Sequence, residues 1–264
     1  MLKENIEFNK LSIIIPSLNQ GNYLEKNLNS ILNQGYPNLE IIIVDGGSTD
    51  NTLKVIEKFK DKIDKFIFKK DRNQANAINI GIQESSGDWL SWQNSDDMYI
   101  NNCFQFINNI INTNNVDVIS GDIYLIDDKD KLIREIIYCQ PTYKSLLAEG
   151  MVISNQSTFW KKSLHSKIGY IDENYNYSFD YDFFIRLLKN SKNIHFKKYF
   201  GALRIHNLTK SYNNSEDFNV ENKIILKKYP NYKLFKYFYM LKRLLYYLSK
   251  FELNYIYRGF KKRF

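Results

Sequence analysis

Short apolar runs alternate with amphipathic helical segments through the first hundred residues, and this alternation restricts the fold more than any other feature of the chain. The apolar runs are rich in Ile and Val and have the length of buried strands, whereas the segments between them repeat apolar residues at helical spacing. Strands and helices that alternate in this way form βαβ units with a mainly parallel sheet. The predicted strands are at 11–19, at the start of 39–52, at 64–70 and at 88–93, and the predicted helices are at 21–34, 52–60 and 73–85.

Polar motifs follow three of these strands where each strand ends: SLN at 17–19, VDGGSTD at 44–50 and NSDD at 94–97. The carboxyl ends of parallel strands lie at one edge of a sheet, where α/β proteins bind ligands, so the three motifs should converge there. The last motif places two carboxylates, Asp96 and Asp97, behind an aromatic strand. Carboxylate oxygens suit Mg²⁺ and Mn²⁺, so this motif indicates a cation site. An exposed acidic turn is the alternative.

The pattern is looser beyond residue 100. Helices are expected near 102–113, around 143–149 and at 178–190, and strands at 116–127 and 203–206. The length of 264 residues suits one sizeable domain or a domain with an appendage. We expect one domain at 1–215 and a basic, aromatic-rich helical tail at 216–264.

Positive charge is concentrated in the tail. Residues 223–264 contain 12 Lys and Arg and one acidic residue, Glu252, whereas the preceding 222 residues have 25 basic and 28 acidic side chains. A uniformly basic surface would favour nucleic acid as a partner. A nearly neutral body with a basic tail instead indicates local contact with something anionic, and no nucleic acid is expected.

The tail also has the pattern of an amphipathic helix. Leu234, Phe238, Leu241, Leu245 and Leu248 recur at helical spacing, with basic residues on another side. Such a helix can lie on the anionic inner leaflet of a membrane, with its apolar side chains in the interface. The alternative is a helix that packs this stripe on the body or on a second copy, which leaves a homodimer open.

Targeting signals and cysteine chemistry are not indicated. The amino-terminal segment lacks the apolar region of a secretory signal, and no run reaches the roughly 18 apolar residues of a membrane span, so we expect a cytoplasmic protein. Cys103 and Cys139 have neither a CxxC spacing nor a neighbouring histidine, so we expect neither a disulfide framework nor a zinc site.

Taken together and in order, the motifs resemble those of the inverting family 2 glycosyltransferases with the GT-A fold. The blocks that carry the resemblance are IIIPSLNQGNYLEKNLNSILNQ, VDGGSTDNT, the stretch from NQANAINIGI to GDWLSWQNSDD, FDYDFFIRL and a later LRIHNLTKS. They cover about residues 10–212, and the NSDD version is similar to members from bacterial surface-polysaccharide synthesis. The resemblance implies a Rossmann-like three-layer α/β domain with a mainly parallel mixed sheet. In it, residues 10–100 bind the nucleotide and residues 101–215 bind the acceptor.

The resemblance also implies a donor site and a metal site. Asp45 is expected to accept a hydrogen bond from the base, although a plain strand-to-helix turn would also use an aspartate there. The implied donor-binding residues are Pro16, Ser17, Asn19, Asp45, Gly46, Asn76, Asn79, Asn94, Ser95, Arg204 and Lys210. The implied ligands of a Mn²⁺ or Mg²⁺ ion, which stabilises the departing diphosphate, are Asp96, Asp97 and His206.

An inverting transfer needs a carboxylate that takes the proton of the acceptor hydroxyl. The resemblance assigns this role to Asp180, in the first turn of the predicted helix 178–190. The helix dipole also favours an acid there by about 0.3–1 kcal/mol, which is the structural alternative. Two residues depart from the family pattern: Asn94 stands where the DxD motif has its first Asp, and Phe179 stands where a Glu precedes the base.

The implied function is a metal-dependent, inverting transfer of a sugar from a UDP-sugar or dTDP-sugar to a glycan or lipid-linked acceptor in surface polysaccharide synthesis. The protein would be peripheral on the inner face of the membrane. A degenerate, non-catalytic nucleotide-sugar binding module or scaffold is the alternative, favoured only by Asn94 and Phe179. A sugar nucleotidyltransferase would need a phosphate loop rich in glycine and basic residues after the first strand, and SLNQGNY is not one.

Overall fold

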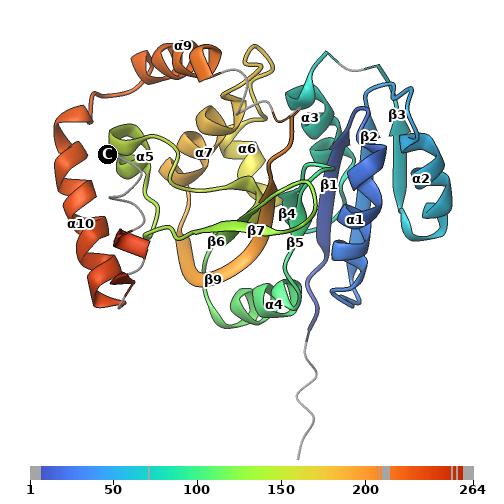
Figure 1. Ribbon diagram of the computed structural model, residues 1–264, viewed down its shortest axis with the longest axis horizontal. Coiled ribbons are helices and arrows are strands. Elements are labelled where there is room, and N and C mark those ends of the chain that lie inside the picture. Colours follow the sequence, from blue (N-terminus) through green and yellow to red (C-terminus); the bar gives the residue numbers. More distant parts are fainter. Residues whose placement is uncertain are drawn as a thin grey trace, which may run out of the picture.

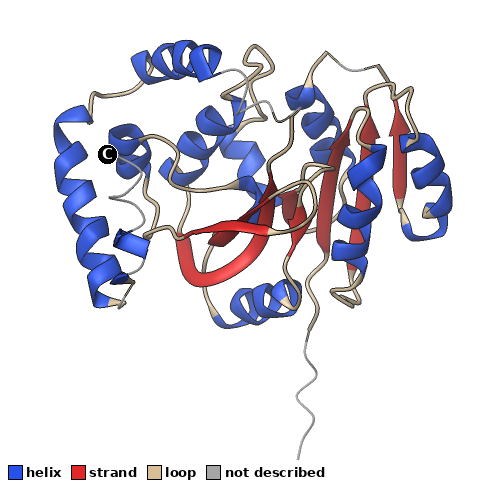
Figure 2. Cartoon of the chain, in the orientation of Figure 1, coloured by secondary structure: helices blue, strands red, loops and turns tan. Residues whose placement is uncertain are grey.

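A nine-stranded sheet crosses the molecule and carries helices on both faces (Figure 1, Figure 2). The computed structural model describes residues 7–70, 72–207, 209, 215–250, 252–253 and 255–257. The strands are β1 (Leu11–Ser17), β2 (Leu39–Asp45), β3 (Lys65–Phe68), β4 (Trp89–Trp92), β5 (Met98–Tyr99), β6 (Val118–Ile126), β7 (Leu132–Ile136), β8 (Thr158–Lys161) and β9 (Asn193–Arg204). Their order is β3-β2-β1-β4-β8-β6-β9-β5, with β7 paired to β6.

Two hydrophobic cores lie on opposite faces of the sheet. Successive side chains of a strand point to opposite faces, so Ile13 and Ile15 of β1 join one core while Ile14 joins the other. This is why β1 is buried along its whole length. The helices are α1 (Gly21–Leu32), α2 (Thr52–Lys58), α3 (Gln74–Glu84), α4 (Cys103–Thr113), α5 (Tyr143–Glu149), α6 (His165–Ile168), α7 (Phe179–Lys189), α9 (Ser215–Lys227) and α10 (Lys236–Ser249). Short 3₁₀ turns are η1 (Lys60–Lys62), η2 (Asn155–Ser157), η3 (Lys162–Leu164) and η4 (Lys233–Phe235).

The predicted α/β fold is confirmed, and the sheet is parallel where the βαβ pattern is regular. Strands β1 to β4 pair in parallel, and β6 pairs in parallel with β9. Strands β5, β7 and β8 pair antiparallel with their neighbours, so the second half of the sheet is mixed. The sequence predicted neither β5 nor β7, and β9 begins at Asn193, well before the predicted strand at 203–206. These strands lack the regular spacing of the first four.

The register of the sheet brings the first two motifs together. In the ladder between β1 and β2, Ser17 lies opposite Asp45, so the loops after both strands start at the same edge. Pro16 lies beyond the end of the ladder between β1 and β4, whose last pair is Ile14 with Trp92, so its missing N–H breaks no bond to β4. The carboxyl edge of the sheet is therefore where the expected site should form.

The tail packs against the body through α9 and α10. Ile225 of α9 is fully buried in the core that contains α5 and α7. The hydroxyl of Tyr247 in α10 donates to the carbonyl of Ile137 at 2.7 Å. Cys103 and Cys139 are free, as expected. Within the described ranges, every helix is too short or too polar to cross a bilayer.

Candidate active site

The loops after β1 and β2 are joined by hydrogen bonds. Asn19 has a φ of 53°, in the left-handed region that Asn tolerates better than most residues. Its backbone N–H donates to Ser48 Oγ at 2.8 Å, and its side-chain oxygen accepts from the backbone N–H of Thr49 at 2.8 Å. The Gly46 N–H donates to the Ser17 carbonyl at 2.9 Å. Two motifs that are separated in the sequence thus form one rigid rim.

The buried side chain of Asp45 stabilises the turn that follows β2. It is completely buried, and its carboxylate accepts from the backbone N–H groups of Gly47 at 3.0 Å and Ser48 at 2.7 Å and from Ser48 Oγ at 2.6 Å. Gly47 has a φ of 101°, a conformation that glycine adopts at little cost. Three hydrogen bonds of the turn thus fix the Asp45 carboxylate, and Oδ2, which accepts only one of them, has acceptor capacity left, so the expected contact with the base stays a prediction. Ser17 Oγ, by contrast, is buried without a hydrogen-bond partner among the described residues.

The two carboxylates of NSDD have different surroundings. Asp97 is buried, and its oxygens accept from the backbone N–H of Arg204 at 2.9 Å, Asn94 Nδ2 at 3.0 Å and Gln156 Nε2 at 2.6 Å. Burial, together with the charge of Asp96, raises the pKa of Asp97 well above its usual range. Asp97 therefore ties the turn to β9 and η2 through both carboxylate oxygens, at a position where the sequence predicted a metal ligand. Its partners lie 59 and 107 residues away, too far for sequence periodicity to reveal.

Helices α1 and α3 also contact the NSDD turn. Asn27 Nδ2 donates to the carbonyls of Asn94 at 2.9 Å and Asp97 at 3.0 Å. Gln74 Nε2 donates to the side-chain oxygen of Asn94 at 2.8 Å. Ser95 is buried within the turn. The side chain of Asn94 is therefore engaged by protein on both its oxygen and its nitrogen, where the sequence predicted a donor contact.

Arg204 is a structural residue, contrary to the expectation of a donor contact. It is fully buried, its Nε donates to the carbonyl of Asp96 at 2.7 Å, and its guanidinium pairs with Asp130. It also lies 5.0 Å from the centre of the Tyr23 ring. A buried guanidinium needs hydrogen-bond acceptors for its N–H groups. One of the acceptors of Arg204 is the carbonyl of Asp96, so Arg204 fixes the backbone at Asp96.

Asp96 and His206 meet at this edge, where Asp96 keeps part of its side chain exposed and His206 is buried. Asp96 Oδ2 and His206 Nε2 lie 2.9 Å apart, and 18% of the Asp96 side chain is exposed against 5% for His206. The His206 ring is 4.7 Å from the ring of Tyr23. No group of three His, Cys, Asp or Glu side chains within the described ranges could hold a metal ion by itself. One carboxylate and one imidazole nonetheless fit a Mg²⁺ or Mn²⁺ ion that takes its other ligands from water and phosphate.

The asparagines of α3 hold a loop rather than face a ligand. Asn76 Nδ2 donates to Glu173 Oε2 at 3.0 Å, and Asn79 Nδ2 donates to Glu173 Oε1 at 2.8 Å. Asn79 also exchanges two hydrogen bonds of 2.9 Å with the backbone of Ile171. The expected donor contacts of Asn76 and Asn79 are therefore replaced by bonds that fix the loop leading into α7.

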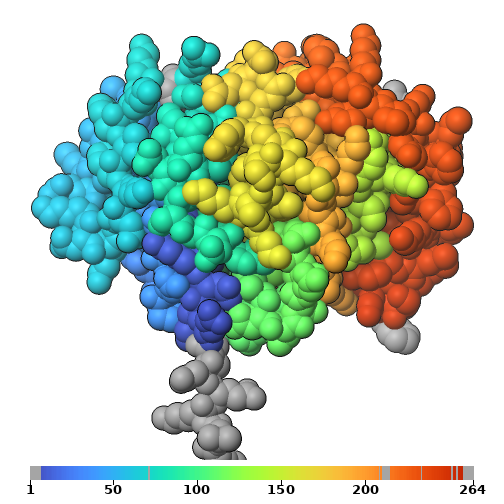
Figure 3. All heavy atoms as spheres, turned by 180° about the vertical axis from the view of Figure 1, so that it is seen from behind, coloured from blue at the N-terminus to red at the C-terminus, as the bar shows by residue number. Residues whose placement is uncertain are grey.

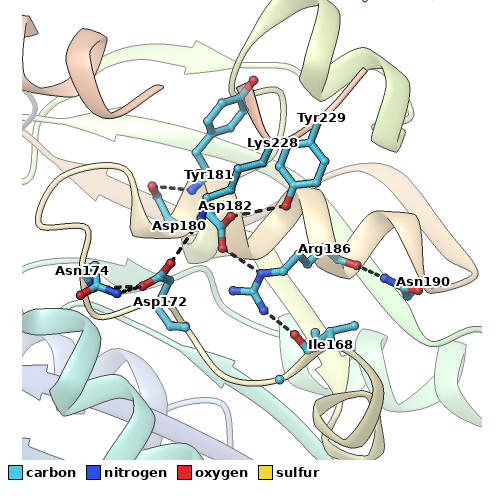
Figure 4. A network of polar contacts seen from close by, with 12 residues as sticks. Ile168, Asp172, Asn174, Asp180, Tyr181, Asp182, Arg186, Asn190, Lys228 and Tyr229 are labelled. Atoms are coloured by element: carbon cyan, nitrogen blue, oxygen red, sulfur yellow. Dashed lines mark hydrogen bonds and ion pairs between the residues drawn. The ribbon is translucent and has the colours of Figure 1, made fainter. Parts of the chain in front are cut away.

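Asp180 is the second residue of α7 and is not part of a salt bridge among the described residues. Its Oδ1 accepts from the backbone N–H of Tyr181 at 2.8 Å (Figure 4). Burial, with a smaller effect from the charge of Glu221, raises the pKa of Asp180 from 3.8 to about 7. A carboxyl group that titrates near neutral pH suits a general base.

Glu221 of α9 holds the loop before α7, a role that the sequence did not indicate. Its carboxylate accepts from the backbone N–H groups of Asn176 at 2.9 Å, Tyr177 at 2.9 Å and Ser178 at 2.7 Å. These groups precede α7, where backbone donors lack partners within the helix. Helix α9 of the tail thus fixes the loop that leads into α7 and Asp180.

Asp182 has a different environment from Asp180, although only one residue separates them (Figure 4). It is buried, its Oδ2 accepts from Arg186 Nε at 2.8 Å, and its Oδ1 accepts from the Tyr229 hydroxyl at 3.4 Å. Asp182 therefore links Arg186 of the same helix to Tyr229 beyond α9. Lys210, expected near the diphosphate, lies outside the described residues.

Comparison with known sequences identifies relatives. A sequence model of the family described as Glycosyl transferase family 2 matches residues 12–169. An uncharacterized glycosyltransferase of Rickettsia typhi is 34% identical over 198 residues, which are 72% of this chain and 62% of that protein. Glycosyltransferase GlyG of Streptococcus pneumoniae is 29% identical over 154 residues, 57% of this chain and 51% of that protein. The chain therefore spans about three fifths of the length of the Rickettsia relative.

Solved structures share the fold. S. aureus TarS 1-349 in complex with UDP-GlcNAc superposes with a TM-score of 0.67 at 19% identity, over 82% of this chain and 65% of that chain. Mannosyltransferase PcManGT from Pyrobaculum calidifontis, in complex with GDP-Man and Mn²⁺, superposes with a TM-score of 0.58 at 15% identity, over 77% of this chain and 59% of that chain. These structures confirm the predicted GT-A fold.

Proposed function

Because the chain belongs to glycosyl transferase family 2, we propose that it transfers a sugar, with inversion, from a nucleoside diphosphate sugar to a glycan or lipid-linked acceptor in surface polysaccharide synthesis. UDP and dTDP are the proposed carriers. The best support is that two neighbouring residues at the amino-terminal end of α3 connect the NSDD turn to the loop before Asp180. Gln74 bonds to Asn94 of the NSDD turn, and Asn73 bonds to the carbonyl of Glu173 in the loop before Asp180.

Asp96 and His206 are the proposed protein ligands of a Mn²⁺ or Mg²⁺ ion. When bound, such an ion would offset the charge that develops on the departing diphosphate. Asp97, Asn94 and Arg204 support Asp96 by fixing the turn on both sides, so they act on the metal site through its geometry. Asn94, which stands where the DxD motif has its first Asp, has a structural role in this turn, because its side-chain oxygen accepts from Gln74 and its side-chain nitrogen donates to Asp97.

Asp180 is the proposed general base. It would take the proton of the acceptor hydroxyl while that oxygen bonds to the anomeric carbon. The bond from this carbon to the diphosphate oxygen breaks on the opposite side, and its electron pair leaves with the diphosphate. Glu221, Glu173 and Ser178 would keep the loop before Asp180 in one conformation during the reaction.

The rim formed by Pro16, Ser17, Asn19 and the Asp45 turn is the proposed wall of the nucleoside site. Ser17 Oγ is buried and has no hydrogen-bond partner among the described residues, which supports a role toward the donor. Gly46 has no side chain, so its backbone would approach the nucleoside directly. Lys210 stays a proposed phosphate contact on sequence grounds alone.

The first test is thermal stability of the whole chain with UDP, dTDP, GDP, CDP and ADP, each with and without Mn²⁺. A ligand that binds the native state raises its stability by mass action. We expect UDP or dTDP to stabilise the protein in a metal-dependent way, and Asp96→Ala to remove the metal-dependent part. No stabilisation of well-folded protein by any nucleotide would contradict the donor site.

A second experiment separates an enzyme from a scaffold. Asp180→Asn should keep the metal-dependent nucleotide shift and lose sugar transfer. A variant that retains full transfer would show that the base is elsewhere, and a wild-type protein that binds nucleotide but transfers no sugar to any acceptor would favour the non-catalytic module.

A further inference from the structure

The apolar stripe of the tail faces solvent. Leu234, Phe238, Leu241, Leu245 and Leu248 form this outer stripe, and their exposed fractions are 88%, 61%, 56%, 56% and 44%. The helix α10 that carries most of it lies along one side of the molecule, at the opposite end from β3 (Figure 1). In the view from behind, the orange-to-red tail forms a whole edge of the surface (Figure 3). The structure thus excludes the alternative in which this stripe packs on the body.

Contacts on the other side of α10 fix this orientation. Tyr247 is buried, and its hydroxyl donates to the carbonyl of Ile137 at 2.7 Å. Arg243 Nη1 pairs with Glu149 Oε2 at 2.6 Å, and Glu149 is almost fully buried. Rotation of the helix to bury the outer stripe would break both contacts and leave the Glu149 charge without its partner, so the exposed stripe is a stable feature.

The charge around the stripe indicates what covers it. Lys242 follows Leu241 of the stripe and is exposed at its edge, whereas Lys236 lies on the other side of the helix, near Glu149. Tyr237, 80% exposed, borders the stripe on its opposite edge. Helix α10 contains no acidic residue, and Glu252 just beyond it is paired with Lys197. A contiguous exposed apolar stripe on a helix that carries basic and no acidic residues marks an interaction surface for a partner of negative charge.

We propose that the outer stripe docks on a bilayer that contains anionic lipid. Leu and Phe side chains would enter the boundary between head groups and acyl chains, and Lys242 would reach lipid phosphates from the flank of the helix. A second copy of the chain fits less well, because two stripes that face each other would bring the Lys242 side chains together with no acid on either helix. The proposal rests on the tail alone and does not depend on glycosyl transfer.

Flotation of the full chain with lipid vesicles tests the proposal. We expect binding to vesicles in which about a third of the phosphatidylcholine is replaced by phosphatidylglycerol, and weak binding to phosphatidylcholine alone. Phe238→Gln combined with Leu245→Gln should lower the partition coefficient by at least about tenfold, since both side chains leave the interface. Lys242→Gln should lower the partition coefficient on anionic vesicles about fivefold, and added salt should also lower it.

A matched control removes exposed aromatic side chains from β3, far from α10. Phe66 and Phe68 of β3 are 43% and 56% exposed, and Phe66→Thr with Phe68→Thr should leave vesicle binding unchanged. Glutamine keeps helix propensity and threonine keeps strand propensity, so all variants should fold. The proposal is overturned if wild-type protein does not float with anionic vesicles or if the α10 variant binds as well as the control. It is also overturned if sedimentation shows a dimer that only the α10 variant dissociates.

Discussion

Replacement of Asp180 by Asn should make the protein more stable and less active at the same time. The pKa of this carboxyl is raised from 3.8 to about 7 by burial, so the folded protein resists its ionisation. The native state holds the proton between these two values while the unfolded state has lost it, so the free energy of unfolding falls as pH rises through this window. Below about pH 4 both states are protonated, and the penalty disappears.

The size of the effect follows from the same shift. At about 1.4 kcal/mol for each pH unit, ionisation of Asp180 costs the folded protein up to about 4 kcal/mol above pH 7. Partial exposure of the carboxyl makes about 1–4 kcal/mol the realistic range. Asn cannot ionise and still accepts from the Tyr181 N–H, so the variant should gain this stability above pH 7 and match wild type near pH 4. Loss of the base should lower turnover by about 10²–10⁴-fold.

Urea unfolding of both proteins at about pH 4.5 and pH 8 measures this difference directly. Asp182→Asn on the same helix is the control, because it removes a partner of Arg186 and should destabilise at both values of pH. The reasoning is refuted if Asp180→Asn is less stable at pH 8 by about 0.3–1 kcal/mol. That result is expected when the acid serves only to complement the helix dipole.

Four further predictions concern the candidate active site. Wild-type transfer should fall about tenfold per pH unit below pH 7 as Asp180 is protonated, measured as a pH profile of kcat/KM. Glu221→Gln should move this acidic limb to lower pH, because the charge of Glu221 contributes to the raised pKa of Asp180; an unmoved limb would contradict that coupling. Asp97→Asn should destabilise the fold by about 1–3 kcal/mol in chemical unfolding, because the new amide NH₂ group would face either the Gln156 amide or the Arg204 backbone N–H, which are both donors. Asp96→Asn should remove the metal-dependent nucleotide shift with little loss of stability.

The sequence predicted well those features that depend on local spacing. Strands β1 to β4 and the helices between them were predicted because the apolar residues of 11–93 repeat with the periods of strand and helix. The convergence of SLN, VDGGSTD and NSDD at one edge followed from the parallel arrangement of those strands. The GT-A family could be inferred from the order of the motifs alone.

Only the tertiary structure decided what each polar side chain contacts. Asp96 and Asp97 are adjacent and chemically identical, yet one lies partly exposed beside His206 and the other is buried against Gln156 and Arg204. Periodicity in the sequence reports which face of an element is apolar, but not the direction of a side chain in a turn or a partner about a hundred residues away. For the same reason, only the contacts of Tyr247 and Arg243 with the body determined that the tail's apolar stripe faces outward.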